Sequence, residues 1–430
     1  MKLFERLFKH ITLALLLCFL TPTTASSPNN EPTLQADSIE ISLLTCGPRQ
    51  QVYSLYGHTA IRFQDKQTGR DIAINYGVFS FDQPFFVLRF VFGLTDYEMG
   101  IVPFDIFEWE YGPTGCGVRQ QVLNLTAQEK MAIAQAVDRN MEPQNRVYRY
   151  NFFYDNCTTR ARDIIANNLN GRIVYDTSTP QHLNTSTPQH HNTPAQYPTF
   201  RNLIHNYNET HRWARFGNDL LLGVKADYYT TFEQQQFLPE RLCADFERAH
   251  IISADGTKRN LVSSSFWLFE PTTKQQSTQQ TNMSILDVFS PLVTFSILSI
   301  LTLIIAIVEY RRKRIIWVFD TSIMLTTGAC GLLLFAMIFS QHPTVSLNLQ
   351  ILLLNPINIF MLYSVTKAAR QNRIHWWTKA WSALILLLLA GSFLQSYAEG
   401  ITIVALSLLL RNISNIYTLK NTGSKQPQKA

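Results

Sequence analysis

Long apolar runs dominate the C-terminal third of the chain and are separated by short polar loops. A helix needs roughly 20 residues to cross the about 30 Å of hydrocarbon in a bilayer. Five apolar runs are long enough to be predicted as membrane-spanning helices: residues 288–308, 315–339, 347–365, 377–394 and 401–410, the last with an extension toward residue 416. The pattern predicts an all-α membrane domain of about five transmembrane helices over residues 284–418, followed by a tail of residues 419–430.

The preceding stretch, residues 27–283, has the mixed pattern of a globular domain. Thr126 followed by Glu129 forms a capping box and predicts a helix to residue 139, and a second helix is expected to begin near Asn156 and to end near residue 169. Alternating apolar positions and turn signals predict strands over residues 39–44, 58–63 and 71–78, the last two forming a hairpin. The expected fold class is therefore α+β for this domain.

Two segments of the same stretch have low complexity. The hexapeptide TSTPQH occurs twice within residues 176–198, which predicts a surface loop. We assign no function to its histidines, His182, His190 and His191, because polar residues in such an insertion are more often filler. Residues 271–281, rich in Thr and Gln, are expected to form a short tether to the membrane domain.

The N-terminus has the pattern of a targeting segment. Basic residues precede an apolar run over residues 11–20, and small polar residues follow, so residues 1–26 are predicted to be a secretory signal peptide. Cys18 follows three leucines instead of a small residue, which argues against lipidation there.

Charge is scarce and unevenly placed along the chain. Only 16% of the residues are charged, against roughly 25% in an ordinary soluble domain. Residues 309–430 hold twelve Lys or Arg against three Asp or Glu, and these basic residues fall in alternate loops. By the positive-inside rule those loops and the C-terminus are cytoplasmic, which leaves the exported domain in the periplasm of a bacterial inner membrane. The net charge of +6 thus reflects topology, and no nucleic-acid partner is expected.

Four cysteines lie in the exported domain: Cys46, Cys116, Cys157 and Cys243. In an oxidising compartment the default expectation is disulfides. Cys157 differs because it lies at the predicted start of a helix, where the backbone dipole stabilises a thiolate and lowers the thiol pKa. The spacing alone supports a nucleophile and a buried or disulfide-bonded cysteine about equally.

His58 is the candidate base, at the start of a predicted strand beside Gly57. A lone histidine is more often structural, so this assignment requires that His58 face Cys157 and that a third group orient the imidazole. Asp71 and Asn75 on the returning strand of the hairpin are the candidates for that group. We favour Asn75 because it sits nearer the level of His58.

Three polar residues in or beside the membrane helices are candidates for substrate binding: His342 in an external loop, Asn348, and Asn355 inside the third helix. Polar groups within the membrane are functional candidates by default. Hydrogen bonding between helices accounts equally well for the two asparagines. Asn355 also precedes Pro356, which predicts a kink in the third helix.

Several ordered motifs carry a resemblance to a known family. They are LTCGP at residues 44–48, YSLYGHTAIR at 53–62, NYG at 75–77, LNLT at 123–126, YRYNFFYDNCTTR at 148–160, TFR at 199–201, DLLLG at 219–223 and FLP at 237–239, with His342-Pro343, Asn348 and Asn355-Pro356 in the membrane part. Over most of its mature length the chain resembles the bacterial Lnb-type lipoprotein N-acyltransferases. Tyr56 and the insertion at 176–198 depart from the family pattern, and neither touches the proposed Cys/His pair.

The resemblance implies a permuted papain-like thiol fold, with the histidine before the cysteine in the chain. It implies that Cys157 is the acyl-accepting nucleophile and His58 its base. The expected partners are a phospholipid acyl donor, a diacylglyceryl-modified lipoprotein and the membrane. The backbone N–H of Cys157 is expected to donate to the oxyanion. No metal or nucleotide motif occurs, so no cofactor is expected.

Three alternative functions remain open at this point. A membrane-tethered cysteine peptidase or amidase would use the same pair with water as the final acceptor, although the amount of membrane apparatus weighs against it. A lipid hydrolase would release free fatty acid without modifying a lipoprotein. A non-catalytic lipoprotein-binding scaffold would hold Cys157 in a disulfide, with Cys116 or Cys243, and thiol labelling would distinguish it from the enzymes.

Overall fold

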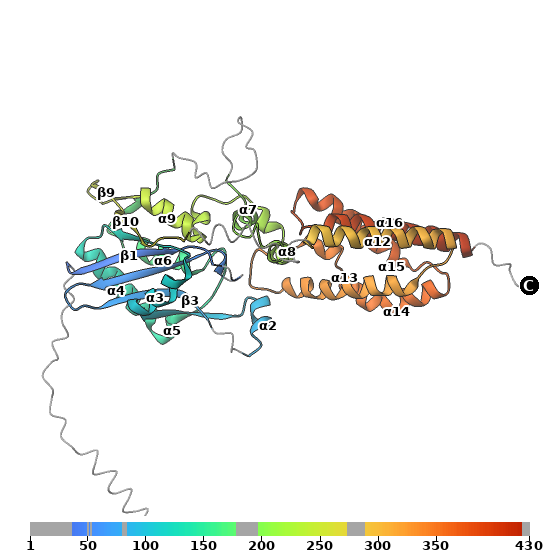
Figure 1. Ribbon diagram of the computed structural model, residues 1–430, viewed down its shortest axis with the longest axis horizontal. Coiled ribbons are helices and arrows are strands. Elements are labelled where there is room, and N and C mark those ends of the chain that lie inside the picture. Colours follow the sequence, from blue (N-terminus) through green and yellow to red (C-terminus); the bar gives the residue numbers. More distant parts are fainter. Residues whose placement is uncertain are drawn as a thin grey trace, which may run out of the picture.

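The computed structural model describes residues 37–49, 51, 54–79, 84–177, 197–272 and 289–423. The predicted signal peptide, most of the repeat-bearing loop and most of the tether lie outside these residues. Figure 1 shows a sheet-based domain followed along the long axis by a helical bundle. The predicted order, an α+β domain and then an all-α membrane domain, is confirmed.

A seven-stranded antiparallel sheet organises the first domain, in the order β10-β5-β1-β2-β3-β4-β6. Its strands are β1 Ile39–Cys46, β2 His58–Asp65, β3 Asp71–Val78, β4 Asp96–Pro103, β5 Val118–Leu123, β6 Val147–Arg149 and β10 Val262–Phe269. The three strands predicted from the sequence correspond to β1, β2 and β3. The predicted hairpin is β2 and β3, in which Ala60 lies opposite Asn75.

Helices pack on the sheet and enclose the main apolar core. α6 (Cys157–Ala166) lies against β2 and β3, and its Ala161 and Ile165 are fully buried with Ile61 and Ile74 of those strands. α4 (Ala127–Met141) begins at the predicted capping box. The other elements are α2 Phe86–Val91, α3 Phe104–Tyr111, η2 Gly112–Thr114, α5 Pro143–Arg146, α7 Phe200–His205, α8 Arg212–Leu221, η3 Val224–Asp227, η4 Glu233–Phe237, α9 Pro239–Arg248, and a small sheet of β7 Arg172–Val174, β8 His250–Ile252 and β9 Lys258–Asn260.

The bundle contains the five predicted spans, with different bounds. Its elements are α12 Pro291–Arg312, α13 Trp317–Met337, η5 Leu349–Leu352, α14 Ile357–Arg370, α15 Trp376–Ala390, η6 Gly391–Phe393 and α16 Ile401–Gly423. The third span was predicted as one helix with a kink, but it is divided into η5 and α14 at Asn355-Pro356. Pro356 has no N–H to donate, and Asn355 Oδ1 accepts a hydrogen bond from Ile357 N–H (3.0 Å) and so starts a new helix. α16 also continues beyond the predicted limit near residue 416.

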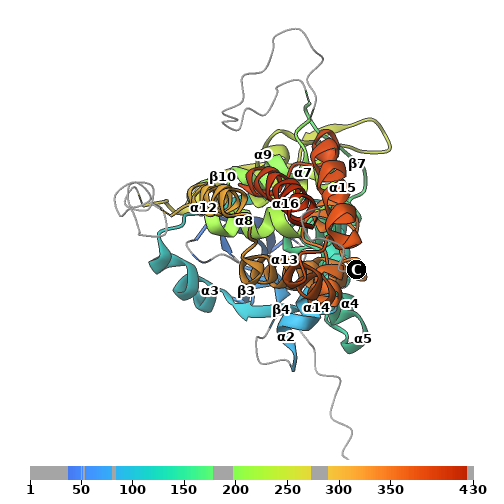
Figure 2. The same cartoon turned by 90° about the vertical axis from the view of Figure 1, so that its right-hand side faces the viewer.

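Buried side-chain amides join the sheet domain to the membrane bundle. Three side chains of the bundle donate hydrogen bonds to backbone carbonyls at and just after the end of α8: Asn348 to Leu220 (2.7 Å), Gln350 to Asp219 (2.9 Å) and Gln395 to Leu222 (3.0 Å). α8 also lies against α12, as the end view in Figure 2 shows. Because buried polar groups are costly to separate from their partners, these bonds fix the sheet domain on the bundle.

Candidate active site

The N-terminus of α6 positions the candidate nucleophile. Asn156 caps this helix: its Oδ1 accepts hydrogen bonds from the N–H groups of Thr158 and Thr159 (both 2.9 Å). Its amide nitrogen donates to two backbone carbonyls outside the helix, and the side chain is buried. Cys157 is therefore held as the first helical residue, where the helix dipole favours a thiolate.

Cys157 and His58 form a hydrogen-bonded pair between α6 and β2. Burial alone would raise the pKa of Cys157, but the charge and hydrogen bond of His58, with bonds from Thr59 N–H and the Thr158 hydroxyl, bring that pKa below its ordinary value. Burial likewise acts to lower the pKa of His58, whereas Cys157 and Asn75 together raise it above its ordinary value. The pair therefore favours thiolate and imidazolium, the reactive state of a cysteine.

Asn75, on the neighbouring strand β3, is the third side chain of the site and contacts His58. Its Oδ1 lies 3.0 Å from His58 Nε2, so it accepts a hydrogen bond when that nitrogen carries the proton. The other ring nitrogen is then left for the thiol. Asp71 instead pairs with Arg62 through two hydrogen bonds of 2.9 and 2.6 Å. Of the two candidates for the third group, the structure thus brings Asn75 to the imidazole and engages Asp71 elsewhere.

A hydroxyl that the sequence analysis did not single out lies beside the pair. Tyr148 on β6 is 8% exposed, and its Oη has no hydrogen-bond partner among the described residues. A Cβ added to Gly77, whose φ is +84°, would lie 3.8 Å from both Tyr148 Oη and Cys157 Cβ. Burial, followed by the charge of Cys157, raises the pKa of Tyr148, so the hydroxyl keeps its proton and can donate it. The only sequence signal was an alternation of tyrosines at residues 148 and 150, which does not show which of them faces the thiol.

Both domains of the chain match models of a known family. Residues 27–202 match the family model of the Lnb N-terminal periplasmic domain, and residues 280–422 match that of the Lnb transmembrane domain. The chain belongs to the Lnb family. No curated protein and no solved structure matches it significantly. Membership indicates a lipoprotein N-acyltransferase-like protein that crosses the inner membrane several times and carries a periplasmic domain.

The cysteines of this Lnb-family chain are free thiols throughout the part that the structure describes: Cys46, Cys116, Cys157, Cys243 and Cys330. The expectation of disulfides, including one from Cys157 to Cys116 or Cys243, is therefore wrong. Cys157 is engaged by His58, whereas Cys46 and Cys116 lie in a different apolar cluster on the sheet. Burial raises the pKa of Cys46 well above its ordinary value and that of Cys243 to about 11, so these two thiols are unreactive.

The polar residues considered for substrate binding make contacts within the protein. Asn348 caps η5 and bonds to the end of α8, and Asn355 caps the start of α14. The bond from Asn348 to α8 matches the interpretation of hydrogen bonding between helices, whereas the bond that Asn355 accepts from Ile357 N–H is local to the start of α14. His342 lies beside Phe90 of α2, and burial lowers its pKa. Any role of the three in binding substrate in this Lnb-family protein stays a prediction.

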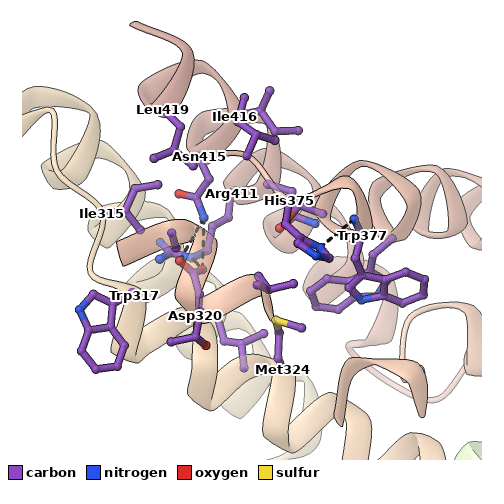
Figure 3. A pocket seen from close by; sticks show the side chains of 18 of the residues that line it. Ile315, Trp317, Asp320, Met324, His375, Trp377, Arg411, Asn415, Ile416 and Leu419 are labelled. Atoms are coloured by element: carbon purple, nitrogen blue, oxygen red, sulfur yellow. Dashed lines mark hydrogen bonds and ion pairs between the residues drawn. The ribbon is translucent and has the colours of Figure 1, made fainter. Parts of the chain in front are cut away.

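Figure 3 shows a pocket at the end of the bundle that faces away from the periplasmic domain. Residues from the ends of four spans line it, among them Trp317, Asp320, His375, Arg411 and Asn415. Arg411 is almost fully buried and forms ion pairs with Asp320 (2.7 Å) and Glu309 (3.0 Å), which neutralise its charge. The pocket thus belongs to the bundle and not to the Cys157 site. Within the described ranges, no cluster of three His, Cys, Asp or Glu residues could hold a metal ion.

Proposed function

We propose that the protein transfers an acyl chain from a phospholipid, through a thioester on Cys157, to the α-amino group of a diacylglyceryl-cysteine lipoprotein. The observation that carries this proposal is the hydrogen-bonded series of Cys157, His58 and Asn75 at a helix N-terminus, in a periplasmic domain bonded to a five-span bundle. Such a series activates a thiol for attack on an acyl group. The bundle holds the thiol close to lipid.

In the first half-reaction, the Cys157 thiolate attacks the ester carbonyl carbon, and the C=O electron pair moves onto oxygen. We assign the backbone N–H of Cys157 and the Tyr148 hydroxyl as donors to this oxyanion. When the C=O bond re-forms, the bond to the glycerol oxygen breaks and the His58 imidazolium protonates that oxygen. The products are a lysophospholipid and a thioester on Cys157.

In the second half-reaction, the α-amino group of the lipoprotein attacks the thioester carbonyl. Neutral His58 accepts a proton from the attacking amine, and Cys157 leaves as thiolate when the amide forms. Asn75 keeps the imidazole oriented in both steps. Because water would hydrolyse the thioester, a lipid-covered site favours transfer over hydrolysis.

The proposed topology places both substrates on the same side of the membrane. Basic residues cluster in the loops at the pocket end of the bundle, which the positive-inside rule assigns, with the C-terminus, to the cytoplasm. The end of the bundle that contacts α8 then lies in the outer leaflet. Phospholipid and diacylglyceryl lipoprotein are both expected in that leaflet.

The test is expression of the intact chain, Cys157→Ala and His58→Ala in a bacterium depleted of its own lipoprotein N-acyltransferase. Cys330→Ala is the matched control, because it removes a free thiol from α13. Mass spectrometry of the lipoprotein N-terminal peptide should show an added acyl chain with the intact chain and the control only. If the lipoprotein keeps a free α-amino group and fatty acid is released, although the protein is correctly inserted, the protein is a lipid hydrolase and not a transferase.

A further inference from the structure

The short helix α2, between β3 and β4, exposes apolar side chains. Phe85, Leu88 and Phe90 are 77%, 56% and 49% exposed. Phe85 takes a left-handed φ of +57°, which is uncommon for a bulky residue and marks a constrained segment. Arg89, the only charged residue of α2, pairs with Asp96 at 2.5 Å. A clustered apolar surface without unpaired charge is typical of an interaction site.

α2 lies at the outer end of the membrane bundle. The N–H of Gln341 donates to the carbonyl of Phe92 (2.9 Å), and the His342 ring lies 6.3 Å from that of Phe90. Gln341 follows soon after the end of α13, and Phe339 between them is 65% exposed. In Figure 1, α2 is correspondingly at the side of the sheet domain that faces the bundle. The apolar surface of α2 therefore continues that of the membrane domain at the level where the spans end.

A series of aromatic rings leads from α2 to the thiol. The ring centroids are separated by 5.9 Å from Phe86 to Phe79, 5.0 Å from Phe79 to Tyr97 and 4.4 Å from Tyr97 to Tyr150. Tyr150 reaches the active site at Gly77, where an added Cβ would lie 3.5 Å from Tyr150 Cε2 and 3.8 Å from Cys157 Cβ. Tyr97 is 8% exposed and belongs to the main apolar core, so this contact packs α2 onto the domain that carries the nucleophile.

We propose that α2 inserts into the outer leaflet of the membrane and, through its packed aromatic series, holds the Cys157 site against the lipid surface. The occupant of the exposed surface is thus the hydrocarbon of outer-leaflet phospholipid. Amphipathic segments bind bilayers in this way, with their apolar residues at the boundary between headgroups and acyl chains. Insertion of α2 does not require the proposed acyl transfer.

Photocrosslinking of the full chain in phospholipid vesicles tests this proposal. p-Benzoylphenylalanine replaces Leu88 or Phe90 on α2, and the vesicles of phosphatidylethanolamine and phosphatidylglycerol contain a trace of phospholipid with an alkyne-tagged acyl chain. Ile297 on α12, 51% exposed, is the positive control, and Phe266 on β10, 46% exposed, is the matched control away from the bundle. We expect positions 88 and 90 to capture lipid at yields close to that of 297 and about ten times that of 266.

Capture at positions 88 and 90 no better than at 266, while 297 captures lipid, would overturn insertion of α2. The same yields are expected in a Cys157→Ala background, so a failure of lipid contact is distinguishable from a failure of acyl transfer.

Discussion

Replacing Tyr148 by phenylalanine should change activity and stability in opposite directions. The substitution removes only the hydroxyl, which is buried and has no hydrogen-bond partner in the described structure. The contact of the Arg160 guanidinium with the ring face, at 3.4 Å from the centroid, survives because phenylalanine keeps the ring. The change therefore isolates the hydroxyl from the packing around it.

Both magnitudes follow from the position of that hydroxyl. A buried polar group without a partner costs about 1–3 kcal/mol, so its removal should stabilise the protein by up to that amount. A donor to an oxyanion contributes about 10²–10³ in rate, so transfer should slow by that factor if Tyr148 donates as proposed. A residue with a purely structural role would not produce this combination.

The assay compares initial rates of acyl transfer to a diacylglyceryl-cysteine peptide in proteoliposomes with thermal unfolding of the same full-length protein. Tyr76→Phe is the matched control, because Asn140 donates a hydrogen bond to the Tyr76 hydroxyl (3.1 Å). It should cost about 0.5–1.5 kcal/mol of stability and leave the rate unchanged. An unchanged rate in Tyr148→Phe would refute the oxyanion role, and a loss of stability would show that the hydroxyl has a partner.

Three further changes test the rest of the site. In His58→Ala, Cys157 loses the largest of the interactions that lower its pKa, and burial then outweighs the remaining bonds from Thr59 and Thr158. Alkylation of this thiol should therefore require a higher pH than in the intact chain, and identical pH profiles would contradict the pairing. Asn75→Ala should lower kcat by about 10²-fold with little change in KM, because the imidazole loses its orientation; steady-state kinetics measures both. Asn156→Ala removes four hydrogen bonds and should destabilise the protein by about 3 kcal/mol in chemical unfolding, against about 1 kcal/mol for the N-cap control Thr126→Ala.

The sequence predicted the features that depend on local pattern. The length of the apolar runs predicted the membrane spans, and the charge of the loops predicted their orientation. Alternating apolar residues predicted the hairpin of β2 and β3, and the capping box predicted the start of α4. The preference for Asn75 over Asp71 came from the same hairpin, since strand register determines which residue lies level with His58.

Features that depend on contacts between distant segments could not be predicted in the same way. Tyr148 approaches Cys157 only because β6 pairs with β4 at the edge of the sheet, and no local spacing encodes that pairing. The expectation of disulfides was wrong for a related reason. Cys157 lies in a different apolar cluster from Cys46 and Cys116, and cysteine count alone does not show which residues are neighbours.

Tyr56 connects the candidate active site to the membrane bundle. It precedes His58 by two residues, and its hydroxyl accepts a hydrogen bond from Asn218 of α8 (2.9 Å). The end of α8 is in turn bonded to Gln350 of the bundle (2.9 Å). A short series of bonds therefore runs from the strand that carries the base to the helices that cross the bilayer. The hydrogen bonds of Tyr56 therefore bear on how the Cys157–His58 pair is held relative to the bundle.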